Sequence, residues 1–335
     1  MGVDSAALPN QSDLADEVLD RLGDSSTLLA AFTRAYLHRM PRETALTPDQ
    51  ALQEATGLFQ FIEQRQTPTS VRVFNPTEGT HGYASEGTVV EVNVDDRPFL
   101  VDSVTAELQA YGLAVVRVLH PVIGTIRDGS GRLIEILRAR DAERRESVQH
   151  YVLDRFLDPI DHDSLRGRLQ SVLVDVSVVV RDFDAMVSAT DHMADLARIG
   201  EGPYHGAEVS EAVAFLRWLT EDNFVFLGYR EYRMVETPDG RAVQVVPESG
   251  LGILSDPERS QAFRPLRLAA LAPELRARWE QGPLLVVSKT NRLATVHRRA
   301  RMDYVSVRLV TPERETRGEA RLLGLFTAKA YMESV

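Results

Sequence analysis

Residues 90–111 most constrain the fold, because they join two different periodicities across one short turn. Over 90–94, valines alternate with polar residues, which predicts a strand with one buried face. Over 100–108, leucine and valine recur every four residues, which predicts the apolar face of a helix. The sequence therefore predicts a tight strand-to-helix connection at 95–99.

The connection has two interpretations that the sequence leaves open. Pro98 is expected in the first helical turn, where the missing N–H of proline costs no hydrogen bond. Free N–H groups at a helix start bind anions, so the turn is a candidate ligand site. Carboxylates also favour the positive end of a helix, so Asp95 and Asp96 are alternatively helix caps. The candidate effector-binding residues are Asp95, Asp96, Arg97, Phe99 and Asp102.

The sequence before this segment has a helical pattern. Residues 1–10 are expected to be a frayed terminus, and apolar stripes over 12–64 predict three helices. The third helix is predicted to begin at Pro48, because Thr47 and Gln50 have the spacing of a capping box.

From Thr88 the pattern alternates between strand and helix, after a linker and a loop. We expect a linker at 64–70, a glycine-rich loop at 76–87, strands at 88–94, 113–127, 132–137 and 148–152, and helices at 98–111, 165–180 and 183–199. Pro121 lies within the long strand, which is therefore predicted to be bent or at an edge there. The Asp-Gly-Ser-Gly sequence at 128–131 predicts a hairpin.

The last third is rich in strand patterns and follows a plausible domain boundary at 200–206. We expect a helix at 209–219, strands at 224–234, 242–247, 284–288, 304–310 and 320–327, and largely helical sequence at 262–279. Two strands, helices and then three strands is the element order of a PAS-type fold. The predicted class for the whole chain is α+β with antiparallel sheets.

Composition excludes several kinds of chemistry. The chain has no cysteine, which rules out disulfides, thiolate metal sites and cysteine nucleophiles. A net charge of −11 argues against nucleic acid or a membrane surface as the main partner. No apolar run approaches the roughly 20 residues of a membrane helix. We therefore expect a cytoplasmic protein.

The short motifs predict no active site. The Gly-rich stretch at 250–255 lacks a third glycine and a following βαβ unit, so a structural turn is favoured over a phosphate cradle. The eight histidines have no metal-ligand spacing, and no metal is expected. His120 and His150 lie on neighbouring predicted strands and could meet across a sheet, although hydrogen-bonded core histidines are the favoured interpretation.

One local charge contrast stands out at residues 283–301, which contain no acidic residue. This candidate anion or interface patch consists of Lys289, Arg292, His297, Arg298, Arg299 and Arg301. An anion or nucleotide site is one interpretation. An interface with an acidic surface of the protein's own assembly is the favoured one.

Many ordered segments carry a family resemblance. They are residues 92–104, 146–150, 215–219, 226–230, 250–254, 288–290, 295–298, 302–305 and 323–327. Together they resemble the N-terminal region of the large bacterial NAD-dependent glutamate dehydrogenases, over about residues 70–335. In that family a distant C-terminal domain deaminates L-glutamate with NAD.

The apolar pattern predicts a helical segment at 1–66, and the resemblance implies an ACT-like (ferredoxin-like) domain at 67–200 and a PAS-like five-stranded antiparallel domain at 201–335. It implies a non-catalytic regulatory and assembly region without catalytic, cofactor-binding or metal-binding residues, because NAD belongs to the catalytic part of the parent enzyme. The implied partners are that catalytic region and sister subunits. The alternative is an amino-acid sensor that binds its effector at the Asp95–Asp102 turn. Ligand-binding ACT domains usually carry a glycine after this turn, where the present chain has Phe99.

Overall fold

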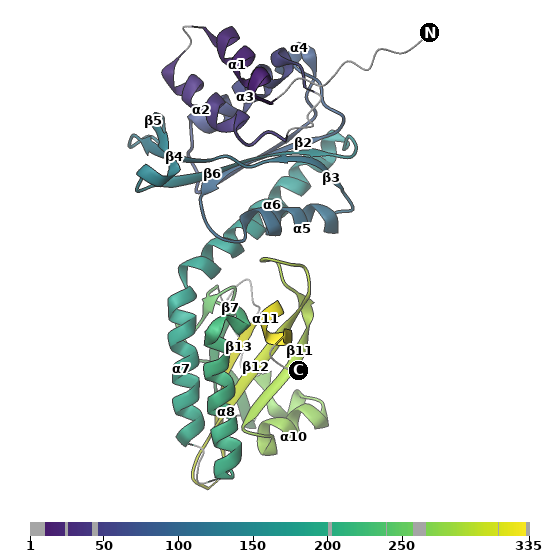
Figure 1. The fold of residues 1–335 in the computed structure, drawn as a ribbon. Coiled ribbons are helices and arrows are strands. Elements are labelled where there is room, and N and C mark those ends of the chain that lie inside the picture. The colour runs from purple at the N-terminus through teal and green to yellow at the C-terminus, as the bar shows by residue number, and fades with distance from the viewer. Residues whose placement is uncertain are drawn as a thin grey trace. The chain divides into compact units, whose positions relative to one another are not determined.

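The chain forms two compact units, residues 1–174 and residues 175–335. A computed structural model describes residues 11–23, 26–41, 46–199, 203–238, 240–256, 266–313 and 315–332 (Figure 1). The boundary between the two units falls within one helix, α6. The predicted frayed terminus at 1–10 and part of the predicted boundary at 200–206 lie outside the described residues.

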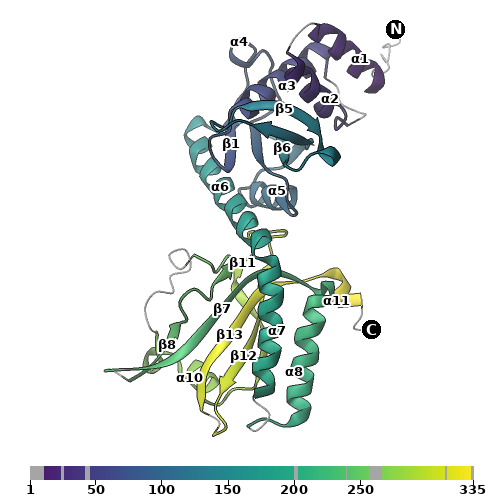
Figure 2. The same ribbon diagram turned by 90° about the vertical axis from the view of Figure 1, so that its left-hand side faces the viewer.

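The first unit is an α+β fold. Its elements are α1 (Gln11–Leu22), α2 (Thr27–Leu37), α3 (Pro48–Glu63), β1 (Thr69–Phe74), α4 (Glu78–His81), β2 (Val89–Asp95), α5 (Leu100–Ala110), β3 (Val115–Leu119), β4 (Val122–Arg127), β5 (Leu133–Arg138), β6 (Arg145–Leu153) and the start of α6 (Pro159–Arg181). The strands form one antiparallel sheet in the order β1-β2-β6-β4-β5, with β3 also paired to β6. Helices α1–α3 cover one face of this sheet, and α5 and α6 cover the other (Figures 1 and 2).

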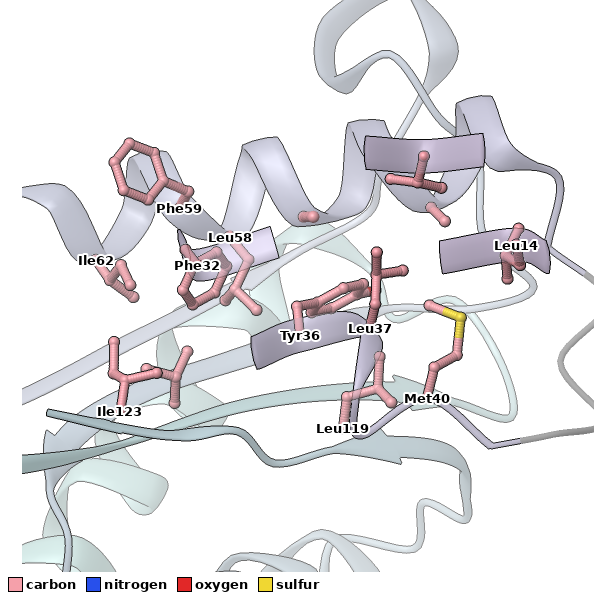
Figure 3. Close-up of a cluster of buried hydrophobic side chains, with 14 of the residues drawn as sticks. Leu14, Phe32, Tyr36, Leu37, Met40, Leu58, Phe59, Ile62, Leu119 and Ile123 are labelled. Atoms are coloured by element: carbon pink, nitrogen blue, oxygen red, sulfur yellow. The ribbon is translucent and has the colours of Figure 1, made fainter. Parts of the chain in front are cut away.

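The three predicted N-terminal helices are confirmed. The Thr47 hydroxyl accepts a hydrogen bond from the Gln50 backbone N–H, and the Gln50 side chain accepts one from Thr47, so the predicted capping box is present. Apolar side chains of these helices form one core with the sheet, in which Ile62 lies near Ile123 and Leu37 near Leu119 (Figure 3).

Two predictions about the strands of this unit are wrong. Residues 69–70 were expected in a linker, but they begin β1, which pairs with β2 along its whole length. The strand predicted at 88–94 was expected to have one buried face, but β2 is buried on both. Its polar side faces α3, because Arg72, which donates to Glu91, also donates to the Gly57 carbonyl oxygen of that helix. The predicted bend at Pro121 is confirmed, because the chain is divided there into β3 and β4. The predicted hairpin at 128–131 is also confirmed by the pairing of β4 with β5.

The second unit consists of helices packed against a second antiparallel sheet. Its elements are the end of α6, α7 (Phe183–Ile199), α8 (Gly206–Trp218), β7 (Phe224–Thr237), β8 (Gly240–Val245), β9 (Leu251–Gly252), β10 (Leu266–Arg267), α10 (Pro273–Gln281), β11 (Leu285–Leu293), β12 (Arg301–Val310), β13 (Thr316–Phe326) and α11 (Ala328–Met332). The sheet order is β10-β8-β7-β13-β12-β11, with β9 also paired to β7. Helices α7 and α8 lie side by side, and α7 packs on the sheet (Figure 2).

All five strands predicted for this unit are present, and two short strands, β9 and β10, extend the sheet. The expected helical stretch at 262–279 is only partly helical: 266–267 form β10, α10 begins at Pro273, and 262–265 lie outside the described residues. None of the described helices is long and apolar enough to cross a membrane.

Candidate functional site

The predicted strand-to-helix turn is present, but its local geometry differs from both expectations. Helix α5 begins at Leu100, so Pro98 lies in the turn before the helix rather than in its first turn. The capping residue is Phe99 rather than an aspartate, and its side chain makes no capping hydrogen bond. The prediction that Asp95 and Asp96 cap the helix is therefore wrong. The side chain of Asp102 is in the first helical turn.

Phe99 adopts a left-handed backbone conformation, with φ of 70°. This conformation costs an L-residue roughly 1–2 kcal/mol and is the one that glycine adopts freely. The chain therefore keeps a glycine-like backbone at the position where ligand-binding ACT domains usually have glycine, although the residue is phenylalanine. Strain of this kind gathers at functional sites.

The carboxylate of Asp95 faces arginines rather than the helix. Its Oδ1 accepts hydrogen bonds from Arg65 at 2.8 Å and from Arg144 at 3.1 Å, and Arg97 lies 3.9 Å from its Oδ2. Burial raises the pKa of Asp95, but the hydrogen bond and charge of Arg65, followed by those of Arg144, outweigh burial and lower it. Asp96 lies apart, 3.8 Å from Arg145.

A fully buried carboxylate, that of Glu146, lies beside Asp95 and Arg65, and sequence analysis marked it only as part of the resembling segment 146–150. Glu146 of β6 accepts hydrogen bonds from Arg127 at 2.7 and 2.8 Å, from Asn93 at 2.8 Å and from Thr125 at 3.0 Å, and Arg65 lies 3.3 Å away. Burial raises the pKa of Glu146, but the hydrogen bonds and charges of these neighbours outweigh it and lower the pKa to about 2. Glu146 is therefore ionised at neutral pH.

Arg127 connects this carboxylate to the helical layer. Its guanidinium also donates to the backbone oxygens of Ile62 at 2.9 Å and Gly131 at 2.8 Å. Carbonyl groups at a helix end lack partners within the helix. The buried ion pair therefore holds the end of α3 against the sheet.

A cavity of about 470 Å³ lies next to this cluster. Asp95, Arg65, Arg127, Arg144 and the turn at 128–131 line it. Of the predicted effector residues, only Asp95 borders this cavity. The carboxylate of Asp95 and the half-exposed guanidinium of Arg144 carry opposite charges, as do the two ends of a small zwitterion.

A second buried cluster lies between the same sheet and the helices. Glu54 of α3 accepts two hydrogen bonds from Arg117, at 2.6 and 2.9 Å, and one from the Tyr36 hydroxyl at 2.6 Å. His150 Nδ1 lies 3.2 Å from Glu91 Oε1, and Glu91 is paired with an arginine of β1. These carboxylates are satisfied by their neighbours, so they stabilise the packing of the helical layer.

His120 and His150, which could have met across the sheet, bind different partners instead. His120 Nε2 is 2.8 Å from the Ser147 hydroxyl, whereas His150 faces Glu91. Burial lowers the pKa of His120. Both histidines are hydrogen-bonded, His150 fully buried and His120 partly buried, and the described residues contain no cluster that could hold a metal ion.

The Gly-rich stretch at 250–255 forms a structural turn, as favoured. Gly252 has φ of 58°, and a Cβ there would lie 2.3 Å from the Leu227 carbonyl oxygen. Its N–H donates to Asp182 at 2.8 Å, so the turn does not offer this group to a phosphate. The residues present do not fit a nucleotide cradle.

The predicted basic patch gathers on one hairpin of the second unit. Lys289 and Arg292 lie on β11, Arg301 begins β12, and the other three residues lie between these strands. Lys289 Nζ lies 2.6 Å from Asp303, and Arg298 donates to the Phe326 carbonyl oxygen at 2.7 Å. The two roles predicted for this patch, an anion or nucleotide site and an interface with an acidic surface, stay predictions.

The region around the turn matches a known family. Residues 32–169 match the model of the glutamate dehydrogenase ACT1 domain. The chain is 31% identical over 343 residues to the NAD-specific glutamate dehydrogenase of Halomonas elongata, a match that covers 99% of this chain. The chain belongs to the NAD-specific glutamate dehydrogenase family. It corresponds to the N-terminal region of these enzymes.

Other members of the glutamate dehydrogenase family match as well. The enzyme of Pseudomonas aeruginosa is 32% identical over 79% of this chain, and that of Mycobacterium tuberculosis is 28% identical over 51%. These matches cover 21%, 16% and 10% of the three relatives, so the chain spans about a fifth of their length or less. The turn, the cavity and both buried clusters lie within the ACT1 match, and the basic patch lies outside it.

Proposed function

We propose that the chain is a non-catalytic regulatory and assembly region of a cytoplasmic NAD-dependent glutamate dehydrogenase. The parent enzyme would convert L-glutamate, NAD and water to 2-oxoglutarate, ammonium and NADH. Similarity to such an enzyme along 99% of the chain, over only about a fifth of the enzyme's length, carries the proposal. The proposed parts are a helical segment (1–66), an ACT-like domain (67–200) and a PAS-like domain (201–335).

The chemistry of the buried carboxylates supports a non-catalytic role. A general base works best when its pKa lies near the working pH. Glu146 has a pKa of about 2, and arginines hold both it and Glu54, so neither is suited to take a proton from a substrate. The order of strands and helices in the second unit supports the PAS-like assignment.

Two assays test this proposal. The purified chain with L-glutamate and NAD should give no NADH fluorescence, and sustained NADH production would overturn the non-catalytic role. The rest of the parent enzyme, produced as a separate polypeptide, should change its kinetics and sedimenting mass when the chain is added. If neither changes, the regulatory and assembly role is wrong.

A second candidate function is amino-acid sensing at the Asp95–Asp102 turn. The cavity beside Asp95 and Arg144 favours it, because their charges complement the ammonium and carboxylate groups of an amino acid. Calorimetry against a panel of amino acids should then show binding that Arg144→Gln weakens and that the exposed control Arg140→Gln preserves. Silence across the panel would remove this function, and binding unchanged by Asp96→Ala would exclude Asp96 from the site.

A further inference from the structure

The basic patch lies at an open edge of the second sheet. We define the basic hairpin as residues 285–301, which comprise β11, the connecting segment and the start of β12. Among the described strands β11 pairs only with β12, so its outer edge presents unpaired backbone groups. Its register is interrupted between Lys289 and Leu293. An irregular edge of this kind disfavours continuous strand addition and leaves recognition to side chains.

The exposed side chains of the basic hairpin combine charge with apolar surface. Val287 is 45% and Leu293 is 44% exposed. Arg292 and Arg301 are both exposed near the same end of the hairpin, where Leu293 pairs with Arg301. A cationic surface with an apolar component is suited to an acidic protein surface.

The charge of the chain limits which surface of a second copy the basic hairpin can bind. The chain carries a net charge of −11, so most orientations of two copies repel each other. Direct pairing of two β11 edges would bring Lys289 and Arg292 of the two copies close together, which is unfavourable. A second copy can therefore be bound only where the basic hairpin meets acidic residues.

Helix α7 of the same unit offers such residues on one face. Asp184, Asp191 and Asp195 are exposed at spacings of seven and four, which places them on one side of the helix. The opposite side, including Met186 and Met193, is buried. Arg198 pairs with Asp195, but Asp184 and Asp191 make no ion pair among the described residues.

We propose that the basic hairpin of one copy binds the acidic face of α7 in a second copy. Each copy carries both surfaces, so two identical contacts related by a two-fold axis would close a dimer. This inference deepens the assembly role proposed above by naming the surfaces. Because the pairs are exposed, the association is expected to weaken as salt screens their charges.

Complementary charge reversal tests the proposal on the chain itself. At about 50 mM salt the wild-type mass, measured by sedimentation over a concentration series, should rise from 37.4 kDa toward twice that value, and about 500 mM salt should reverse the rise. Arg292→Glu with Arg301→Glu should remain monomeric, and so should Asp184→Arg with Asp191→Arg. An equal mixture of these two variants should dimerise, because each reversed surface then meets its opposite.

A matched control variant tests whether the position of the substituted charges matters, or only the change in net charge. Arg140→Glu with Arg166→Glu lowers the net charge by as much as Arg292→Glu with Arg301→Glu, but at exposed residues of the first unit, and should leave dimerisation unchanged. Circular dichroism checks that every variant folds. A wild type that stays at 37.4 kDa throughout, or folded variants that fail to associate when mixed, would overturn the inference. The sedimentation experiment contains no substrate. A failure to dimerise therefore does not decide the proposed non-catalytic role, which the NADH assay tests separately.

Discussion

Replacing Glu146 with glutamine should destabilise the first unit strongly. The substitution keeps the size of the side chain and removes the charge that Arg127 and Arg65 face in the buried cluster. A pKa of about 2 in the folded protein, against an ordinary 4.5, corresponds to about 3 kcal/mol of stabilisation of the ionised form. Breaking one partner of a buried pair costs a similar 3–5 kcal/mol or so in other proteins.

The sign of the pH dependence follows from the direction of the shift. The folded-state pKa of Glu146 lies below its unfolded value, so the stabilisation is fully present above pH 4.5. It is lost as the pH falls from there through about 2, where the folded carboxylate takes up its proton. The difference between wild type and Glu146→Gln should therefore be greatest at neutral pH and shrink in acid.

Hydrogen exchange in peptides of β2 and β6 measures this effect locally. At neutral pH the opening free energy should fall by about 3 kcal/mol in Glu146→Gln, which is roughly 100-fold faster exchange. The matched control is Glu135→Gln, an exposed glutamate of β5, which should change stability by less than about 0.5 kcal/mol. An effect of Glu146→Gln as small as the control's, or one that persists at pH 2, would refute the reasoning.

Three further predictions concern single positions. Phe99→Gly should be about 1 kcal/mol more stable than Phe99→Ala in urea unfolding, because both lose the ring but only glycine adopts φ of 70° without strain; equal stability would contradict it. Gly252→Ala should cost clearly more than Gly23→Ala in the thermal midpoint, since both have φ between 55° and 60° but only Gly252 has a carbonyl oxygen, that of Leu227, 2.3 Å from the new Cβ. Tyr36→Phe should cost about 1.5–3 kcal/mol in urea unfolding, because it removes a 2.6 Å hydrogen bond to a buried carboxylate, and a neutral result would show that this bond contributes nothing.

Local patterns were sufficient for most elements of the fold. The helix at Pro48 begins where its capping box predicts, and the break at Pro121 follows from a proline inside a strand pattern. The strand at 69–74 was missed because a polar stretch leads into it and only its pairing with β2 defines it. The helix after Pro98 starts two residues late, because Phe99 takes a left-handed conformation that no residue preference predicts.

The candidate site could be predicted only in part. The turn and Asp95 followed from the sequence, but the arginines that engage Asp95 come from residues 65 and 144, far from it along the chain. Glu146 falls in a segment that carries the family resemblance, but nothing in the sequence indicated its burial, since an acidic residue at the start of a strand is usually exposed.

The sequence by itself determined which segments are helices and strands, the α+β class and the family, because these depend on neighbouring residues and on their order. The tertiary structure alone decided what the polar face of β2 is for. Glu91 and Asn93 indicate an exposed face by their polarity, yet α3 buries them, and arginines of other elements satisfy their cluster. A buried charge is stable only with its partner, and here the partners meet only when distant segments fold together.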